Sequence, residues 1–130
     1  MSVSILDARA KLAAVLAPLD DDEPPLYDNL VDAIHPPCIM LGWRIPMIDW
    51  AGQTPCTAFG TLGLTLVGGR IDAAGGVEAI ESMYDTVQRR LRADSQGWAM
   101  RTDGGIVRYE IGNVLYLACR VDVRVPLAVG

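Results

Sequence analysis

The sequence has 130 residues, 51% of them hydrophobic and 21% charged, which is typical of one globular domain. A domain of this size can bury a hydrophobic core without disulfides or metals. The net charge of −5 lies within residues 1–35, because residues 36–130 contain nine acidic and nine basic residues. This balance argues against a broad basic face that binds nucleic acid.

The three cysteines, Cys38, Cys56 and Cys119, follow no zinc-binding or redox spacing and stand beside apolar residues. We expect reduced thiols in the core and no disulfide. No basic start followed by an apolar run is visible, so no signal peptide is expected. No apolar run approaches the ~18 residues of a membrane span, so we expect no membrane contact.

The first predicted element is a helix over residues 4–17. Ser4 can cap its start, and Asp7 lies in the first turn, where a negative charge suits the helix dipole. Apolar residues recur on one side at helical spacing: Ile5, Ala8, Leu12, Val15, Leu16 and Leu19. Pro18 ends the helix. The one-sided stripe favours packing on the same domain over an exposed interaction helix.

Residues 20–25 predict an acidic loop that ends in two prolines. Its acidic residues are consecutive and rarely turn toward one ion together, so we expect a solvated loop and no metal site. The next stretch, Tyr27 to Ile39, contains Pro36 and Pro37, which lack backbone N–H groups and favour an extended chain. We predict a turn and an extended run that enters a strand at Cys38.

Two strands are predicted next, at Cys38–Trp43 and Thr57–Val67, the second ended by Gly68-Gly69. Residues 44–55 predict a long irregular loop with apolar residues on it. Apolar bulk on a loop often marks a surface that contacts another protein. The alternative is that one tryptophan folds back over the core.

The clearest helix is predicted at Asp72–Arg92, with Asp72 as its cap and Gly75-Gly76 fraying the first turn. Arg89, Arg90 and Arg92 suit the negative end of the helix dipole. They either bind the acidic groups of a partner or form a solvated helix end.

Three further strands are predicted at residues 96–101, 106–111 and 114–125, with turns at Gly104-Gly105 and Gly112-Asn113. The last strand alternates between an apolar and a mixed face and reads as a half-buried antiparallel strand. The whole chain, 1–130, therefore predicts one α+β domain. We expect a mostly antiparallel four- to five-stranded sheet with two helices packed on it.

The residues predict no catalytic chemistry. His35 is the single histidine, and no acid, base and nucleophile can be assembled around it, so we interpret it as a turn residue. Gly68-Gly69-Arg70 lacks the Lys-Ser/Thr of a phosphate-binding loop. We expect no enzyme activity, no cofactor and no metal.

The stretch Y-D-N-L-V-D-A-I-H-P-P-C-I, from Tyr27 to Ile39, resembles a segment of the tail terminator proteins of long-tailed bacteriophages that infect actinobacteria. Tyr27 and Asp28 match a tyrosine-containing turn, and Pro36-Pro37-Cys38 match the start of a strand. Val31 departs from the pattern, because a proline is common there. The later order of strand, helix, hairpin and long final strand is also similar.

The resemblance implies a structural protein of the virion that assembles in the host cytoplasm into a ring, typically a hexamer. Such a ring lies at the head-proximal end of the tail, caps the tail tube, ends its polymerisation and contacts the head–tail connector. DNA only passes through its lumen. The ring needs no active site, because its work is shape and charge complementarity.

A closed ring repeats one contact, so two different patches of each subunit must pair. We hypothesise that the arginines of the second helix pair with the acidic loop of the next subunit. The basic patch is Arg89, Arg90 and Arg92, and the acidic patch is Asp20, Asp21, Asp22 and Glu23. A third surface, the segment with Trp43, Ile48 and Trp50, is the candidate contact with the tube or the connector.

Two other functions fit the sequence. The nearer one is another neck or connector component, or a minor tail protein. The other is a small soluble α+β enzyme or ligand-binding domain, which predicts a monomer or dimer with a closed polar pocket.

Overall fold

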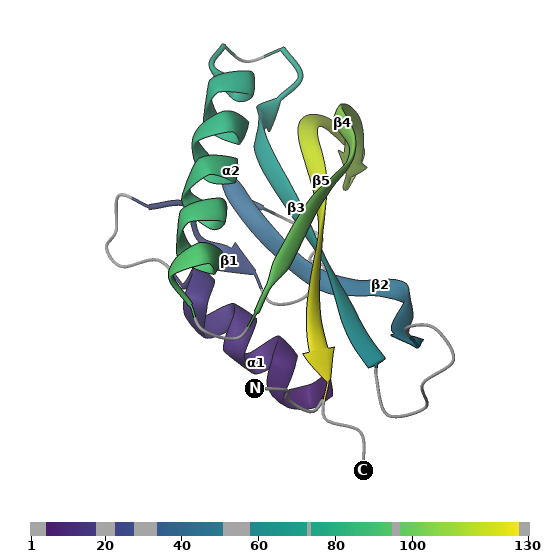
Figure 1. Cartoon of the computed structure of the whole chain (residues 1–130). Helices are drawn as coiled ribbons and strands as arrows, with labels where there is room; N and C mark the ends of the chain where they lie inside the picture. Colours follow the sequence, from purple (N-terminus) through teal and green to yellow (C-terminus); the bar gives the residue numbers. More distant parts are fainter. Residues whose placement is uncertain are drawn as a thin grey trace.

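The structure, a computed structural model, describes residues 5–17, 23–27, 34–50, 58–72, 74–94 and 97–127. The elements in chain order are α1 (Ile5–Leu16), β1 (Leu26–Tyr27), β2 (Cys38–Trp50), β3 (Ala58–Arg70), α2 (Gly76–Ala93), β4 (Ala99–Ile111) and β5 (Val114–Leu127). The strands form one five-stranded sheet of order β1-β2-β3-β5-β4, in which only β1 and β2 are parallel (Figure 1). The predicted α+β class, with two helices on a mostly antiparallel sheet, is confirmed.

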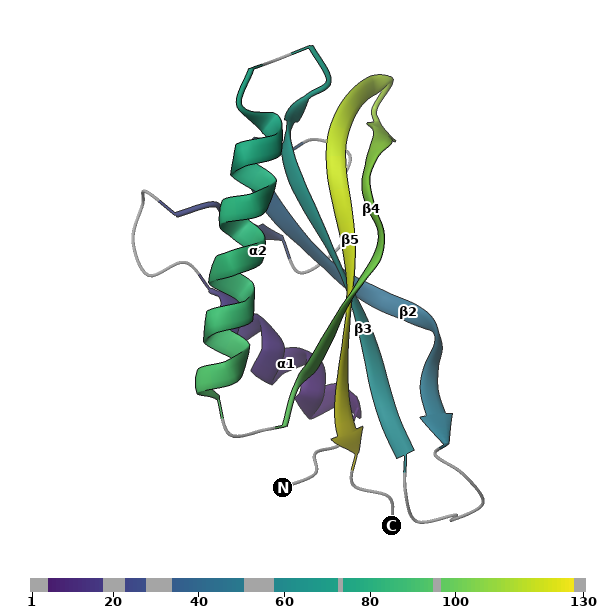
Figure 2. The same cartoon turned by 45° about the horizontal axis from the view of Figure 1, so that its top comes forward.

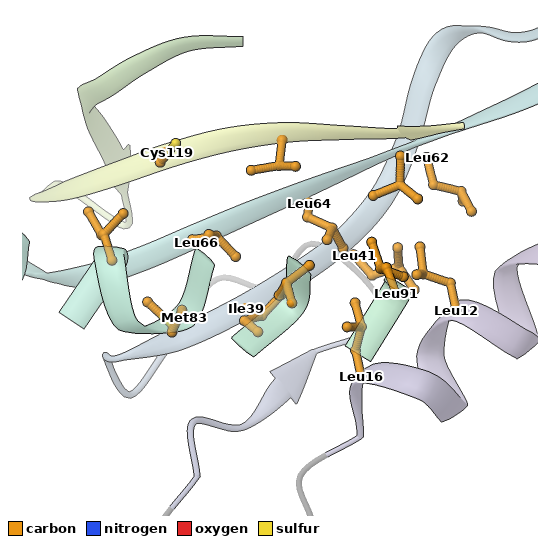
Figure 3. Packing of buried hydrophobic residues seen from close by; sticks show 14 residues of the cluster. Leu12, Leu16, Ile39, Leu41, Leu62, Leu64, Leu66, Met83, Leu91 and Cys119 are labelled. Atoms are coloured by element: carbon orange, nitrogen blue, oxygen red, sulfur yellow. The ribbon is translucent and has the colours of Figure 1, made fainter. Parts of the chain in front are cut away.

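Both helices pack on the same face of the sheet (Figure 2). The side of α2 that meets the sheet carries apolar residues at three- and four-residue spacing: Ile80, Met83, Val87 and Leu91. Leu12 and Leu16 of α1 join them over β2, β3 and β5 (Figure 3). The predicted apolar face of the last strand contributes Cys119, Val121 and Val123 to this core.

A second, smaller cluster lies on the opposite face of the sheet. It consists of residues that alternate with the first core along the strands, together with one residue that precedes β2: Ile34, Cys38, Met40, Val67, Tyr116 and Ala118. Tyr27 and Tyr109 pack against it. The stretch around the two prolines therefore helps to cover one end of the face that the helices leave open.

The predicted loop over residues 44–55 is wrong for its first half, because β2 continues through Trp50 and pairs with Ala58. The ladder between β2 and β3 shifts register between Trp43 and Ile48. Pro46 lies inside this shift, where its missing N–H removes no regular ladder bond. Residues 51–57 lie outside the described residues.

The prediction of two separate strands around Gly104-Gly105 is also wrong. β4 runs from Ala99 to Ile111 as one strand, with a register shift between Asp103 and Ile106. Gly105 has a positive φ of 76°, which fits a bulge that contains glycine. The other predicted turn, at Gly112-Asn113, is confirmed, with positive φ at both residues.

The boundary between β3 and α2 differs from the prediction, because β3 ends later and α2 begins later than expected. β3 passes through Gly68-Gly69 and ends at Arg70, after a shift between Val67 and Gly69. α2 begins at Gly76, with Gly75 as its N-cap, and not at Asp72. The physical reason is a close backbone approach, because Gly68 lies against the carbonyl of Gly76. A side chain at position 68 would prevent this contact.

Candidate interaction surfaces

The last turns of α2 hold the three arginines of the predicted basic patch, and the structure gives each a different environment. Arg90 is mostly buried, and its Nη2 lies 2.6 Å from each carboxylate oxygen of Glu23. Its Nη1 donates to the carbonyl oxygens of Ala17, at 3.1 Å, and Leu16, at 3.4 Å. One guanidinium thus joins α2, the end of α1 and the acidic segment.

Arg90 also provides a positive charge and hydrogen-bond donors at the C-terminus of α1. No basic residue lies in the last turn of α1. The final carbonyl groups of a helix have no partner within the helix and carry its negative partial charge. Arg90 donates to two of them from another helix. We conclude that Arg90 has a structural role within the chain.

This contact changes the predicted pairing between subunits. Glu23 and Arg90 do pair, but within one chain. Arg90 is therefore already occupied and does not serve as a free charge for a neighbour. Asp20, Asp21 and Asp22 lie outside the described residues. The hypothesis of a contact between subunits is left to these acids and to the two exposed arginines.

Arg89 and Arg92 are both exposed. Arg89 forms an i,i+4 ion pair with Asp85 at 3.1 Å, and both side chains are more than half exposed, at 71% and 66%. Such a pair contributes little to stability. Arg92 lies at a pocket of about 170 Å³ between α2 and the start of β4. The pocket is lined by Tyr84, Gln88, Leu91, Arg92, Trp98 and Met100.

The predicted tryptophan-containing surface falls on the second half of β2. Trp43 is the register partner of Leu62, Ile48 of Gly60, and Trp50 of Ala58. The positions thus belong to a strand and not to a loop. Their side chains lie outside the described part, and their contact with another protein stays a prediction.

The segment that leads into β2, called the joint below, is held by a short parallel ladder and one hydrogen bond. Leu26 and Tyr27 pair with Ile39 and Met40 in the parallel β1–β2 ladder. The hydroxyl of Tyr27 accepts the backbone N–H of His35 at 3.3 Å. His35 itself is exposed and contributes a backbone donor here, which agrees with its interpretation as a turn residue.

A charged surface on the open face of the sheet was not among the predicted sites. Arg101, Arg120 and Arg124 are exposed there around the buried Asp122. The Arg124 guanidinium lies 4.4 Å from the centre of the Phe59 ring, a cation–π contact. The alternation along residues 114–125 placed Arg120, Asp122 and Arg124 on one side, but the pairing of Arg101 with Asp122 in the β4–β5 ladder could not be read from the sequence.

Two cysteines lie within the described residues, and both Cys38 and Cys119 are free and buried. Burial raises the pKa of the Cys38 thiol to about 12 and also raises the pKa of Cys119. Since the thiolate is the nucleophile, both groups are unreactive at neutral pH.

We therefore expect native protein treated with iodoacetamide at pH 8 to keep Cys38 and Cys119 unmodified. The same treatment in concentrated urea should label both, because unfolding exposes the thiols and restores an ordinary pKa. Peptide mass mapping measures the labelled fraction. Equal labelling rates with and without urea would contradict the buried positions.

In the described ranges, no three His, Cys, Asp or Glu residues are grouped as a metal site would require. Among the helices that the structure describes, none is long and apolar enough to cross a membrane. No protein-family model matches the sequence, and no curated protein matches it either.

Proposed function

We propose that the chain is a tail terminator subunit, which assembles into a ring that caps the tail tube of a long-tailed phage. The observation that carries the proposal is the joint between Tyr27 and Ile39. Of the residues that resemble the terminator segment, Tyr27 and Pro36-Pro37-Cys38 lie in the described part of the chain. There Tyr27 pairs with Met40 in the β1–β2 ladder and accepts the backbone N–H of His35, and Cys38 begins β2. The likeness thus falls on residues that act together.

The order of the elements supports the same proposal. The resemblance implies a helix, strands, a second helix, a hairpin and a long final strand. The chain has α1, then β2 and β3, then α2, then the β4–β5 hairpin, whose second strand has 14 residues. This agreement concerns the order of the elements, which unrelated α+β domains can share. It therefore supports the proposal less strongly than the contacts of the joint do.

The edges of the sheet are suited to an assembly that repeats head to tail. β4 forms one edge, and β1 borders β2 only at Ile39 and Met40. Within the described residues, β2 from Leu41 to Trp50 and all of β4 therefore have one side without a strand partner. Open strand edges favour association with another chain. Two different edges permit the heterologous contacts from which rings are built.

The first test is the mass of the purified chain, alone and with tail tubes. We expect a ring of six subunits by native mass spectrometry, or rings on tube ends in electron micrographs. A chain that stays monomeric in both experiments would remove the proposal. A closed pocket in a stable monomer would favour the enzyme or ligand-binding alternative instead.

The second test is the position of the protein in the phage. Gold-labelled antibodies should mark the head-proximal end of the tail, and inactivation of the gene should give tails that fail to stop at one length. Tails of normal length that do not join heads would instead favour another neck protein.

A further inference from the structure

The pocket between α2 and β4 has the features of a preformed binding site. Its volume of about 170 Å³ is close to that of engineered cavities that hold a benzene molecule, ~150 Å³. It can therefore accept one large apolar side chain. Tyr84, Leu91, Trp98 and Met100 supply aromatic and apolar walls. Tyrosine and tryptophan are enriched at the centres of protein interfaces.

The walls of the pocket are fixed before any partner binds. Trp98 Nε1 donates to Asp94 Oδ2 at 2.7 Å, and the hydroxyls of Tyr84 and Thr102 are hydrogen bonded at 3.1 Å. The polar atoms of both aromatic residues are thus already satisfied, which leaves their rings for apolar contact. Rigid walls lower the entropy that binding costs.

Arg92 adds a charge to this pocket, whose lining also includes the polar groups of Tyr84 and Gln88. It is exposed, and no hydrogen bond or ion pair joins it to another residue in the part of the chain that the structure describes. A fitting ligand has an apolar side chain next to a carboxylate. The segment between α1 and β1, residues 18–22, has this chemistry: Pro-Leu-Asp-Asp-Asp. It also lies in the part of the chain that carries the whole negative net charge.

The described flanks of this segment lie at another side of α2. Ala17 and Glu23 are both bound to Arg90. Two residue steps along a helix turn the side chain by about 200°, so Arg90 and Arg92 point about 160° apart around α2. A segment from a neighbouring subunit reaches the pocket without a turn around the helix, and cross-linking separates this contact from one within the subunit.

We propose that the pocket between α2 and β4 binds residues 18–22 of a second copy of the chain, with Leu19 as the apolar anchor and the aspartates at Arg92. This contact rests on the proposed ring and names one of its interfaces. It is heterologous, because a pocket at one site binds a segment from another. Arg90 has a different role, since it holds the two ends of the segment in the donating subunit.

The test compares self-association of full-length variants by mass photometry. We expect Arg92→Glu and Leu19→Ala each to weaken association about tenfold or more, as loss of a central contact does. Arg70→Glu is the matched control, because it makes the same charge change at an exposed site at the end of β3, away from the pocket, and we expect a change within about twofold. Thermal melting should show that all three variants remain folded.

Cross-linking identifies the occupant. One chain carries Leu19→Cys and another carries Gln88→Cys, both in a Cys56→Ser background. We expect a disulfide-linked dimer only when the two are mixed. A double variant that closes on itself at high dilution would overturn docking in a second copy.

The outcomes separate the contact from the function. Rings that form normally from Arg92→Glu and from Leu19→Ala overturn the contact but leave the ring intact. A wild-type chain that does not assemble even on tail tubes overturns both.

Discussion

Replacement of Gly68 by alanine is expected to lower the free energy of unfolding by about 3 kcal/mol, at the upper end of what overpacking usually costs. A Cβ atom at this position would collide with the carbonyl oxygen of Gly76 and would lie 2.8 Å from Cγ1 of Ile80. The first contact is with backbone, which cannot rotate away. α2 would have to move off β3, and the packing of Ile80 in the core would be lost with it.

Gly63→Ala is the matched control, because it changes the same residue type in the same strand. No atom lies within 4 Å of a Cβ at Gly63. We expect its free energy of unfolding to stay within about 0.5 kcal/mol of wild type, as at sites without a special contact. Urea titration followed by circular dichroism measures both variants. Equal unfolding midpoints for the two would show that the close approach of Gly68 and Gly76 is not required.

The second large effect is expected from Arg90→Ala, which should cost about 2 kcal/mol of stability. Hydrogen bonds to charged groups contribute roughly 1.5–3 kcal/mol, and the partial exposure of this pair, 19% for Arg90 and 27% for Glu23, reduces the upper end. The substitution removes the guanidinium from Glu23 and from the last carbonyl groups of α1 together. We expect α1 to lose its attachment first.

Two variants make this prediction specific. Arg89→Ala, one residue away, removes an exposed ion pair and an exposed hydrogen bond of 3.5 Å to Thr86, and should cost less than about 0.5 kcal/mol. Arg90→Lys keeps the charge, but one ammonium cannot replace two nitrogens that bind separate partners. We expect it to lie between wild type and Arg90→Ala. If Arg89→Ala and Arg90→Ala unfold at the same urea concentration, the structural role of Arg90 is wrong.

Local signals in the sequence predicted the elements well where a local rule decides the structure. Val77, Ile80, Tyr84, Val87 and Leu91 recur at three- and four-residue intervals, which predicted one apolar face of α2. Ile80, Val87 and Leu91 are buried, but Val77 is exposed and the buried Met83 lies outside the predicted pattern. Gly112-Asn113 gave the hairpin turn, because two adjacent positive φ angles are what this turn requires.

The wrong predictions share one physical cause. Tertiary contacts determine the conformation of residues, such as glycine pairs, that local rules assign to turns. Gly104-Gly105 forms a bulge because β5 is long enough to pair on both sides of it. Gly68 lies within a strand because α2 crosses it. No spacing rule could pair Glu23 with Arg90, because 67 residues separate them. The pocket at Arg92 likewise combines a helix with a strand edge.

The sheet order also determines which parts of the chain can fold early. β4 and β5 are joined by a two-residue turn, so their pairing closes a short loop and can form quickly. The central ladder instead joins β3 to β5, and it pairs Ala58 with Leu127. Its formation has to wait until most of the chain is present, because this pairing closes a long loop. During synthesis on the ribosome, β2 and β3 emerge well before β5, so the edge of β3 that pairs with β5 stays open until the last strand arrives.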